Sequence, residues 1–530
     1  MKIATCFCAV GLFLTAAFSS SAQTLGNAAD LPFSLTLEEV TQDELPGLHS
    51  FALGREGDWW VVVGGRVGGL HGFFPVTGFP EDEANLYVRL LNPETGDERK
   101  FAVDDLAVPF RDALKSTNPQ YAQDGTTLYI SGGYGKDNVQ GKFVTFAVLT
   151  AIDLPVLVAQ MLAGANPSSA FKQVEVPSLR VCGGEMEKMG DWFFLVGGHD
   201  FSGLYSQNGS ATFTQAYTSE IRRFKIQNSG NTLAISDFSA QHDEANLHRR
   251  DFSLAPIVRP DGSEGLALYG GVFRVGADLP FYNPVYIAAD GSHTLDVGYE
   301  QLFSQYTCPV LPIFDQTDGA MYSIFFAGLS VHFMDGGQLK KDEKVPFVKD
   351  ISALRRRADG SSLEFVLPER FDELLGTNMV FVPDEAAPHF PNEVLKLRDM
   401  SGPTFVGWLF GGIKAEIPNI TPSSASKRMF KVYLTPKPAS SADEILTEKT
   451  DLQVLPNPAG ATSSVFVRVS GAVASLQLAD ANGRVWASFS QPTAEDLQRL
   501  SAQMPALPSG VYFLQISGAA GSKVVKWAKM

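Results

Sequence analysis

Six apolar segments that end in two small residues recur along the chain between residues 45 and 435. Each is a short apolar run, which is typical of a strand buried on both faces. Glycine after the run permits a backbone conformation or a close approach that a Cβ atom would block. The fifth copy carries Ala327 in place of its first glycine. The copies are Asp58–Gly65, Thr127–Gly133, Asp191–Gly198, Leu266–Gly271, Ser323–Gly328 and Gly407–Gly412.

The residues around these segments predict four strands per unit. A tight turn precedes several copies, and two more strands joined by a polar turn follow, as in Ala84–Val103 and Ser219–Phe238. Six four-stranded units around an axis form a β-propeller. Pro32–Val40 alternates like a lone strand, and the last unit ends one strand short at Met429–Pro436. We therefore expect the first strand to complete the last sheet; a pair of β-sandwiches or an unclosed solenoid are the alternatives.

The first unit, LHSFALGREGDWWVVVGG (Leu48–Gly65), resembles the kelch repeat in its His-Ser strand, turn, apolar strand and glycine pair. The resemblance covers residues 30–435 and is looser in the fourth to sixth copies. It implies an all-β fold with a six-bladed kelch-type β-propeller over residues 23–436. The units exceed the usual kelch length of about 50 residues, so we expect enlarged loops.

A second, small all-β segment follows a polar linker at residues 437–452. It resembles the type A C-terminal sorting domain of the type IX secretion system of Bacteroidota, and we expect a β-sandwich over residues 453–530. The resemblance implies that the secretion translocon recognises this domain; an ordinary adhesive sandwich is the alternative. The residues that carry it are Pro456, Asn457, Pro458, Asp480, Gly483, Arg484, Gly510, Tyr512, Lys523 and Lys526.

The N-terminus reads as a secretory signal peptide over residues 1–22, with Lys2, an apolar stretch and a small-residue cleavage site. A retained N-terminal helix is the alternative. No other segment has 18 uninterrupted apolar residues, so we expect no transmembrane anchor after the signal is removed. The predicted location is secreted, extracellular or on the outer-membrane cell surface. The formal net charge of −16 argues against nucleic acid as a partner.

The eight histidines are scattered and show no zinc-ligand spacing, so no metal or cofactor is expected. His242, Asp243 and His248 form the densest polar cluster, which we interpret as a loop before an inner strand rather than a metal site. Cys182 and Cys308 are predicted to stay unpaired and buried, since inner strands two sheets apart exceed disulfide reach. Motifs for serine nucleophiles, sialidases, copper oxidases and phosphate loops are not found.

Candidate ligand-binding residues lie where the inner strands begin, at the expected mouth of the channel. His49 and Cys182 each precede the first glycine of their pair by fifteen residues and should occupy equivalent places. Arg249 and Asp251 either bind a polar ligand or satisfy a buried charge. Aromatic residues in His71–Phe79 and Pro280–Tyr286 either stack on ligands or pack beneath loops. The candidate residues are His49, Cys182, His248, Arg249 and Asp251.

The leading hypothesis is an exported binding or scaffolding protein whose propeller takes an extracellular protein or glycan. The second is a secreted carbohydrate-active enzyme with an acidic site in the propeller channel, and the third is a purely structural surface-layer component. No complete catalytic constellation is found, so no catalytic residue is assigned. A pair of close carboxylates with raised pKa values in the channel would favour the enzyme.

Overall fold

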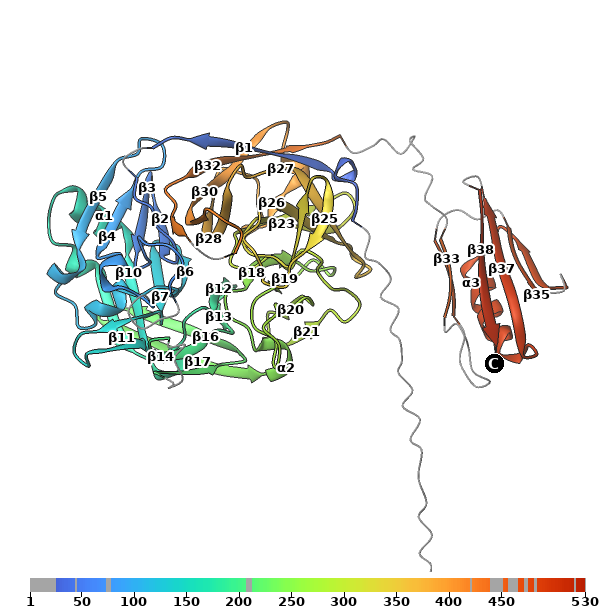
Figure 1. Cartoon of the computed structure of the whole chain (residues 1–530), viewed down its shortest axis with the longest axis horizontal. Helices are drawn as coiled ribbons and strands as arrows, with labels where there is room; N and C mark the ends of the chain where they lie inside the picture. Colours follow the sequence, from blue (N-terminus) through green and yellow to red (C-terminus); the bar gives the residue numbers. More distant parts are fainter. Residues whose placement is uncertain are drawn as a thin grey trace, which may run out of the picture. The chain divides into compact units, whose positions relative to one another are not determined.

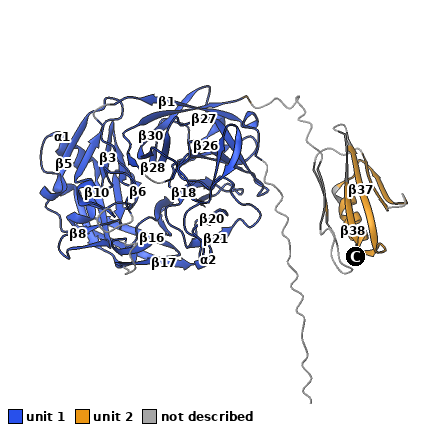
Figure 2. Ribbon diagram, viewed as in Figure 1, with its two compact units in different colours: residues 1–437 blue, residues 438–530 orange. Residues whose placement is uncertain are grey.

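The computed structural model describes residues 25–42, 45–72, 78–205, 212–419, 422–438, 451–455, 466–470, 475–480, 484–518 and 521–529. The chain divides into two compact units, residues 1–437 and 438–530 (Figure 2). The predicted signal peptide and most of the predicted linker lie outside the described residues. So do Pro456, Asn457, Pro458 and Gly483. Among the described residues, no helix is long and apolar enough to cross a membrane.

The described chain is mostly β, which confirms the predicted all-β class. In the first unit, successive stretches of chain form antiparallel sheets with their strands in sequence order. Figure 1 shows β2, β6, β12, β18 and β28 around the middle of this unit, whereas β5, β11, β17 and β27 lie at its rim. The first three sheets contain β2 (Ala52–Glu56), β3 (Trp59–Val63), β4 (Tyr87–Leu91) and β5 (Glu98–Ala102); β6 (Gln120–Asp124), β7 (Thr127–Ser131), β10 (Val148–Asp153) and β11 (Phe171–Glu175); and β12 (Glu185–Met189), β13 (Trp192–Val196), β16 (Glu220–Ser229) and β17 (Thr232–His242).

Three further sheets follow along the chain, and the last of them includes the first strand of the protein. They contain β18 (Ser253–Val258), β19 (Glu264–Tyr269), β20 (Val285–Ala288) and β21 (His293–Leu295); β22 (Val310–Asp315), β23 (Ala320–Phe326), β26 (Asp350–Arg356) and β27 (Ser362–Arg370), with β29 (Leu395–Lys396) beside β22; and β28 (Leu374–Pro383), β30 (Thr404–Ala415), β32 (Met429–Pro436) and β1 (Phe33–Val40), with β31 (Ser423–Ala425) beside β30.

β1 pairs with β32 along its whole length, from Phe33 opposite Pro436 to Val40 opposite Met429. Phe33 and Leu35 are buried in the core of the fifth and sixth sheets. The alternation of buried and exposed residues along β1 follows from the period of two in a strand. The predicted pairing of the first strand with Met429–Pro436 is confirmed.

The small-residue pairs end the second strand of the first five sheets, and the sixth pair lies within β30. The first residue of each pair has φ between 54° and 76° and the second between 77° and 88°. This left-handed region suits glycine, because it imposes little steric cost without a Cβ atom. A Cβ atom on Gly132 would lie 2.0 Å from the carbonyl oxygen of Val181, which belongs to the next sheet. The glycine pairs are therefore where neighbouring sheets meet backbone to backbone.

In five of the six pairs, the second glycine donates its backbone N–H to the first strand of the next sheet or to the segment just before it. From the sixth sheet, Gly412 donates to the carbonyl oxygen of Leu48, just before the first strand of the first sheet. These bonds link sheets that are consecutive in sequence and also the last sheet to the first. They are Gly65 to Ser116 (2.8 Å), Gly133 to Val181 (2.8 Å), Gly198 to Arg249 (2.8 Å), Gly328 to Leu375 (3.3 Å) and Gly412 to Leu48 (2.8 Å).

A second series of links runs through what we call the entry ring: Ser50, Asn118, Gly183, Asp251, Thr307 and Asn378. The first five lie two or three residues before a first strand, Asn378 lies within β28, and all six have φ between 51° and 64°. The backbone N–H of each residue from Asn118 onward donates to the carbonyl oxygen of the preceding ring residue, at 2.5 to 3.2 Å. The Asn378 side-chain amide donates to Ser50 Oγ at 2.7 Å. The entry ring thus joins all six sheets.

Inserted elements account for the length of the units. The second and third units each contribute two strands to an additional four-stranded sheet, which we did not predict from the sequence. Helix α1 extends the second unit, and Asp153 caps it by accepting the Val156 N–H. The insertions are β8 (Tyr134–Asp137), β9 (Lys142–Thr145), β14 (His199–Gly203) and β15 (Phe213–Tyr217) in that sheet, the hairpin β24 (His332–Asp335) and β25 (Gln338–Lys341), and helices α1 (Leu154–Leu162) and α2 (Glu244–Leu247).

Short 3₁₀ helices complete the connections. They are η1 (Ala28–Asp30), η2 (Glu81–Glu83), η3 (Val103–Asp105), η4 (Arg111–Lys115), η5 (Pro167–Ala170), η6 (Pro177–Leu179), η7 (Leu397–Asp399) and, in the second unit, η8 (Met504–Ala506).

The second unit contains a helix beside its two sheets, which we did not expect from its strand pattern. Its four-stranded sheet packs against α3 around buried Leu476, Leu514 and Trp527. Thr493 and Asp496 form a capping box that starts α3. The elements are β33 (Asp451–Leu455) and β34 (Phe466–Ser470) in one sheet, β36 (Val485–Ser490), β35 (Ser475–Asp480), β37 (Gly510–Gly518) and β38 (Gly521–Lys529) in the other, and α3 (Ala494–Gln503).

A carboxylate-lined central cavity

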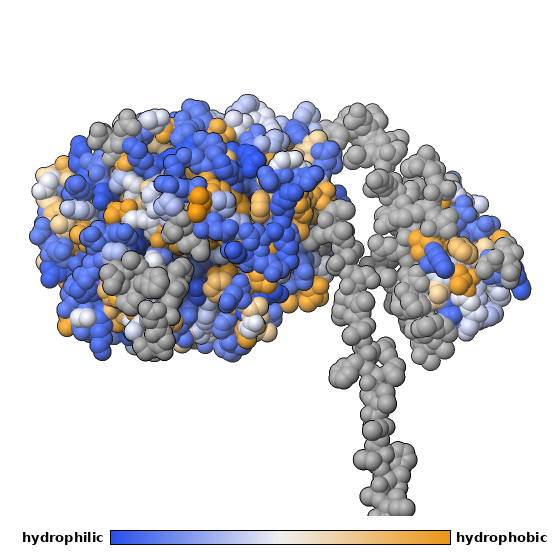
Figure 3. Space-filling view, in the orientation of Figure 1, coloured by the Kyte–Doolittle hydropathy of each residue, from blue (hydrophilic) through white to orange (hydrophobic). Residues whose placement is uncertain are grey.

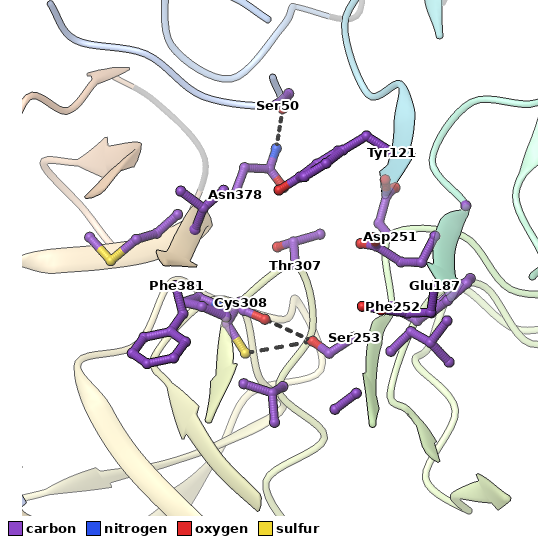
Figure 4. Close-up of a pocket in the computed structure, with 18 of the residues that line it drawn as sticks. Ser50, Tyr121, Glu187, Asp251, Phe252, Ser253, Thr307, Cys308, Asn378 and Phe381 are labelled. Carbon is purple, nitrogen blue, oxygen red and sulfur yellow. Dashed lines mark hydrogen bonds between the residues drawn. The ribbon is translucent and has the colours of Figure 1, made fainter. Parts of the chain in front are cut away.

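A cavity of about 250 Å³ lies among the first strands of the sheets in the first unit. All six residues of the entry ring line it, so its rim is built from small residues, most of them polar. Figure 4 shows Tyr121, Asp251, Thr307 and Asn378 converging on one space, with Ser50 bonded to Asn378. The left-handed backbone of the entry ring places these side chains at the cavity.

Four carboxylates line the cavity: Glu185, Glu187, Asp251 and Glu393. Glu185 and Glu187 are two residues apart on β12, so both point from the same side of the strand, while Met186 between them is buried in the core. Both glutamates are half-buried. Within the described part of the chain, neither forms an ion pair, since the salt bridges of this region involve other carboxylates.

Burial raises the pKa of both glutamates. The pKa of Glu185 rises to about 8, chiefly through burial and then through the charge of Asp251. The pKa of Glu187 also rises to about 8, through burial and then through Glu393 and Glu185. Burial and these two glutamates together raise the pKa of Tyr121, on neighbouring β6. The three side chains therefore form one electrostatically coupled group.

A second cavity of about 490 Å³ shares six lining residues with the first, namely Tyr121, Glu187, Pro256, Phe381, Pro383 and Glu393. Cations occur here, but each has a partner. Arg55 lies 2.6 Å from Glu393 and donates to the Pro383 carbonyl at 2.7 Å, and Lys188 lies 3.1 Å from Asp124. Tyr121 and Glu187 are thus reached from both cavities.

Of the five predicted ligand residues, Asp251 is the one that lines the central cavity. Its Oδ2 accepts a hydrogen bond from Arg250 Nε at 3.1 Å, so its charge is largely compensated. Arg249 is fully buried and donates to the carbonyl oxygens of Asn246, Gly270 and Asn283. Arg249 does not line the cavity, and of the two alternatives the structure favours the buried charge, because its guanidinium holds loops of the fourth sheet.

His49 and Cys182 occupy equivalent positions, as predicted. His49 pairs through its backbone with Arg66, and Cys182 pairs with His199, in both cases the residue after the glycine pair. Both side chains are buried outside the lining of the cavity, which contradicts their predicted exposure to a ligand there. Burial and Arg66 lower the pKa of His49 to about 3, and burial raises the pKa of Cys182 to about 12.

Cys182 and Cys308 are both free and buried, which confirms the predicted unpaired thiols. Cys308 is not the counterpart of Cys182, however. That place in the fifth sheet belongs to Tyr306, which pairs with Leu329 after the small-residue pair. Cys308 lies two residues further on and lines the cavity, with its carbonyl oxygen accepting from Ser253 Oγ at 2.9 Å.

The His242–Asp251 segment begins at the last residue of β17 and contains the short helix α2, where we predicted a loop. His248 stacks on Tyr217, with ring centroids 3.8 Å apart, and lies 2.7 Å from Glu244. It lies outside the lining of the cavity, so its predicted role there is wrong. Asp243 instead accepts from His293, 3.0 Å away. His242 lies 3.9 Å from the same Glu244, so the two histidines share one carboxylate while Asp243 is bound to His293.

The aromatic segments pack beneath loops. His71 stacks on Phe79 at 4.4 Å and on Tyr205 at 5.2 Å. Phe281 is buried under Arg249, and Tyr286 belongs to β20, although we expected a loop there. Residues 73–77 lie outside the described part.

In the second unit, the described residues of the predicted sorting motif hold the fold together. Asp480 accepts from the Arg484 backbone N–H at 3.0 Å and from Trp486 Nε1 at 3.1 Å, which fixes the connection between β35 and β36. Tyr512 is buried opposite Asp480 and donates to the Pro508 carbonyl at 2.8 Å. Gly510 starts β37, and Lys526 is exposed on β38, which also contains Lys523.

We did not single out Tyr121, Glu185 and Glu187 from the sequence. A signal was available, because Glu185 and Glu187 occupy the positions of Ala52 and Gly54 in the first unit. Glu185 pairs with Val196 as Ala52 pairs with Val63. Two acidic residues where another unit has two tiny ones would have indicated a functional strand.

The comparisons with known proteins leave the family open. No family model matches the chain, and no curated protein matches it. A solved structure titled "Structure of YjhT" is 11% identical, with a TM-score of 0.39, and the match covers 73% of this chain and 100% of that one. This likeness is too distant to bear on function.

The double substitution Glu185→Gln and Glu187→Gln should flatten the pH dependence of stability. Both carboxyls bind protons more tightly in the folded chain than in the unfolded one, so their contribution is complete below pH 4.5 and is lost as the pH rises to about 8. The two shifts alone would give ~8 kcal/mol between pH 5 and 9, and because both glutamates are half-exposed to screening by solvent we expect the parent to lose ~3 kcal/mol more than the double variant. Urea denaturation at both pH values measures this. Exposed Glu175→Gln is the control, and equal losses in parent and double variant would contradict the expectation.

Proposed function

We propose that this chain is an exported binding protein whose first unit is a closed six-bladed kelch-type propeller with its ligand site in the central cavity. The bonds from glycine pairs to the next sheet, the entry ring and the pairing of β1 with β32 support closure. The observation that carries the function is the cavity itself, where Glu185, Glu187 and Tyr121 face a common space without a cationic partner. Half-buried carboxylates are costly unless something compensates them.

The second candidate is a carbohydrate-active enzyme, and the raised pKa values of Glu185 and Glu187 favour it. Glycoside hydrolysis needs one carboxyl protonated and the other ionised. In this cavity burial shifts both pKa values in the same direction, whereas an acid and base pair has environments that push its pKa values apart. Binding is therefore the better-supported function.

The test is a glycan and peptide array probed with the full chain, with hydrolysis measured on the same panel. We expect a saturable hit without turnover. The variant Val380→Trp, in a half-buried residue that lines the cavity, should abolish the hit by filling the space. The control Val156→Trp, on the exposed side of α1, should keep it. No hit, or an equal hit with Val380→Trp, would overturn a ligand site in the cavity, and turnover would favour the enzyme.

We further propose that residues 453–530 are a type IX sorting domain and that the protein reaches the cell surface or the medium. The support is the order of the sorting motifs in the sequence and their place at the β35–β36 connection and on β37 and β38.

Removal of β38 (Gly521–Lys529) should therefore stop export in a bacterium that has this secretion system. β38 pairs with β37 over nine residues and buries Trp527, so its loss unfolds the domain that the translocon would read. We expect at least a tenfold fall of the chain in the extracellular and surface fractions, measured by immunoblotting. Arg499→Ala, on the exposed side of α3, is the control. Undiminished export without β38 would contradict the proposal.

A further inference from the structure

The central cavity has an unbalanced charge. Among the described residues that line it, four are carboxylates and none is lysine, arginine or histidine. Surface features are weaker candidates, because apolar residues on the face of the first unit in Figure 3 are scattered among polar ones. The cavity is therefore the place where the chemistry of a ligand is best defined.

The nearby cations are committed to other carboxylates. Arg250 bonds to Asp251 and also donates to the Tyr217 hydroxyl at 2.6 Å. Arg55 pairs with Glu393 at 2.6 Å. With these pairs in place, Glu185 and Glu187 have no compensating cation among the described residues when they ionise. Because both side chains are half-buried, their ionisation without a cation costs free energy, and a cationic ligand would offset that cost.

Tyr121 gives the site a third group from a separate strand. Its ring extends from β6 toward Asn378 in Figure 4, and it lines both cavities together with Glu187. A phenolic oxygen accepts hydrogen bonds, and an ammonium group has three N–H donors and no acceptor. Two carboxylates and one hydroxyl oxygen therefore match the donors of one ammonium group. The cavity volume suits a single side chain or sugar unit and not a large ligand.

We propose that the central cavity binds a primary ammonium group, carried by a lysine side chain or an amino sugar, between Glu185 and Glu187, with the Tyr121 hydroxyl oxygen as a further acceptor. This inference rests on the proposed function of the cavity as a ligand site. It disfavours phosphate and carboxylate ligands, because no described residue of the lining has a basic side chain to pair with them.

Isothermal titration calorimetry on the full chain tests the proposal with Nα-acetyl-lysine amide and methyl glucosaminide. Nα-acetyl-norleucine amide and methyl glucoside are the uncharged counterparts, and Nα-acetyl-glutamate amide is the anionic one. We expect saturable binding of at least one amine and at least tenfold weaker binding of its uncharged counterpart. Which amine binds distinguishes a peptide from an amino sugar. Glu185→Gln combined with Glu187→Gln should weaken amine binding at least tenfold, whereas Glu175→Gln should leave it unchanged.

Proton release gives an independent readout that a merely structural role of the glutamates would not produce. At pH 7 the amine must displace protons from glutamates whose pKa values lie near 8. The binding enthalpy should therefore vary with the ionisation enthalpy of the buffer. The affinity for Nα-acetyl-lysine amide, which stays charged over this range, should rise from pH 6 to pH 9.

Two results would overturn the inference. One is an uncharged or anionic probe that binds at least as well as the amines. The other is amine binding that the double variant leaves intact. Suppose that either result is obtained but Val380→Trp still abolishes the array hit. The cavity then remains a ligand site, and only its assignment to amines is ruled out. If Val380→Trp instead left the array hit unchanged, both the ligand site in the cavity and its assignment to amines would be ruled out.

Discussion

Replacing Gly132 with alanine should lower the free energy of unfolding of the first unit by ~4 kcal/mol. Gly132 has φ of 66°, which costs a residue with a Cβ atom ~1–2 kcal/mol. The new Cβ atom would also lie 2.0 Å from the Val181 carbonyl oxygen, so two sheets must move apart. Overpacking of this kind costs a further ~1–3 kcal/mol. Urea denaturation, followed by hydrogen exchange of peptides from β6 to β13, measures the loss in this unit alone.

Gly125→Ala is the matched control for this prediction. Gly125 has a similar φ of 55°, but nothing lies within 4 Å of its would-be Cβ atom. It should therefore cost only the backbone term, ~1 kcal/mol. If the two substitutions lowered the free energy of unfolding equally, Gly132 would be needed only for its left-handed backbone conformation and not for close contact between sheets.

The one unit without a complete glycine pair supports the same explanation. Ala327 keeps the left-handed φ of 57° at the place of the first glycine. The facing residue in the next sheet is Gly376, whose would-be Cβ atom would lie 3.1 Å from the Ala327 Cβ atom and 2.3 Å from the Phe326 carbonyl oxygen. The alanine on one sheet is thus matched by a glycine on the next, so the close approach is kept.

The repeated part of the fold could be predicted from the sequence because its cause is local. An apolar strand with small residues after it, as at Trp59–Val63, carries its own strand and contact signals. The inserted sheet was missed because β8 and β9 are only four residues long, and its strands come from two units. Helix α3 was missed although Thr493 and Asp496 give a capping-box pattern.

The site was harder to predict than the fold. Our candidates came from residue types that often bind ligands, such as His49 and Cys182, and burial placed them in the walls between sheets. The side chains that face the cavity depend on strand phase, since a shift of one residue on β12 exchanges Glu187 with Met186. Aligning the units by strand register, not by residue type, would have found Glu185 and Glu187.

Deleting residues 1–41, and with them β1, should cost the first unit at least ~5 kcal/mol and leave it unfolded or aggregated. β1 buries Phe33 and Leu35, each 1% exposed, and supplies every partner of β32 on that side. The loss removes buried apolar area and leaves an open edge strand that can pair with other chains. Hydrogen exchange and size-exclusion chromatography of the truncated chain measure both effects.

Removal of residues 1–24 alone is the matched truncation, because it leaves β1 in place, and it should not change the stability of this unit. A synthetic peptide of residues 30–42 should bind the longer truncation and restore exchange protection in β32, since eight residue pairs specify the register. Leu35→Asp should reproduce much of the loss through an unpaired buried charge, whereas exposed Thr36→Asp should not. Native protection of β32 without β1 would mean that the sixth sheet is stable with an open edge. The ring would then not depend on its first strand for closure.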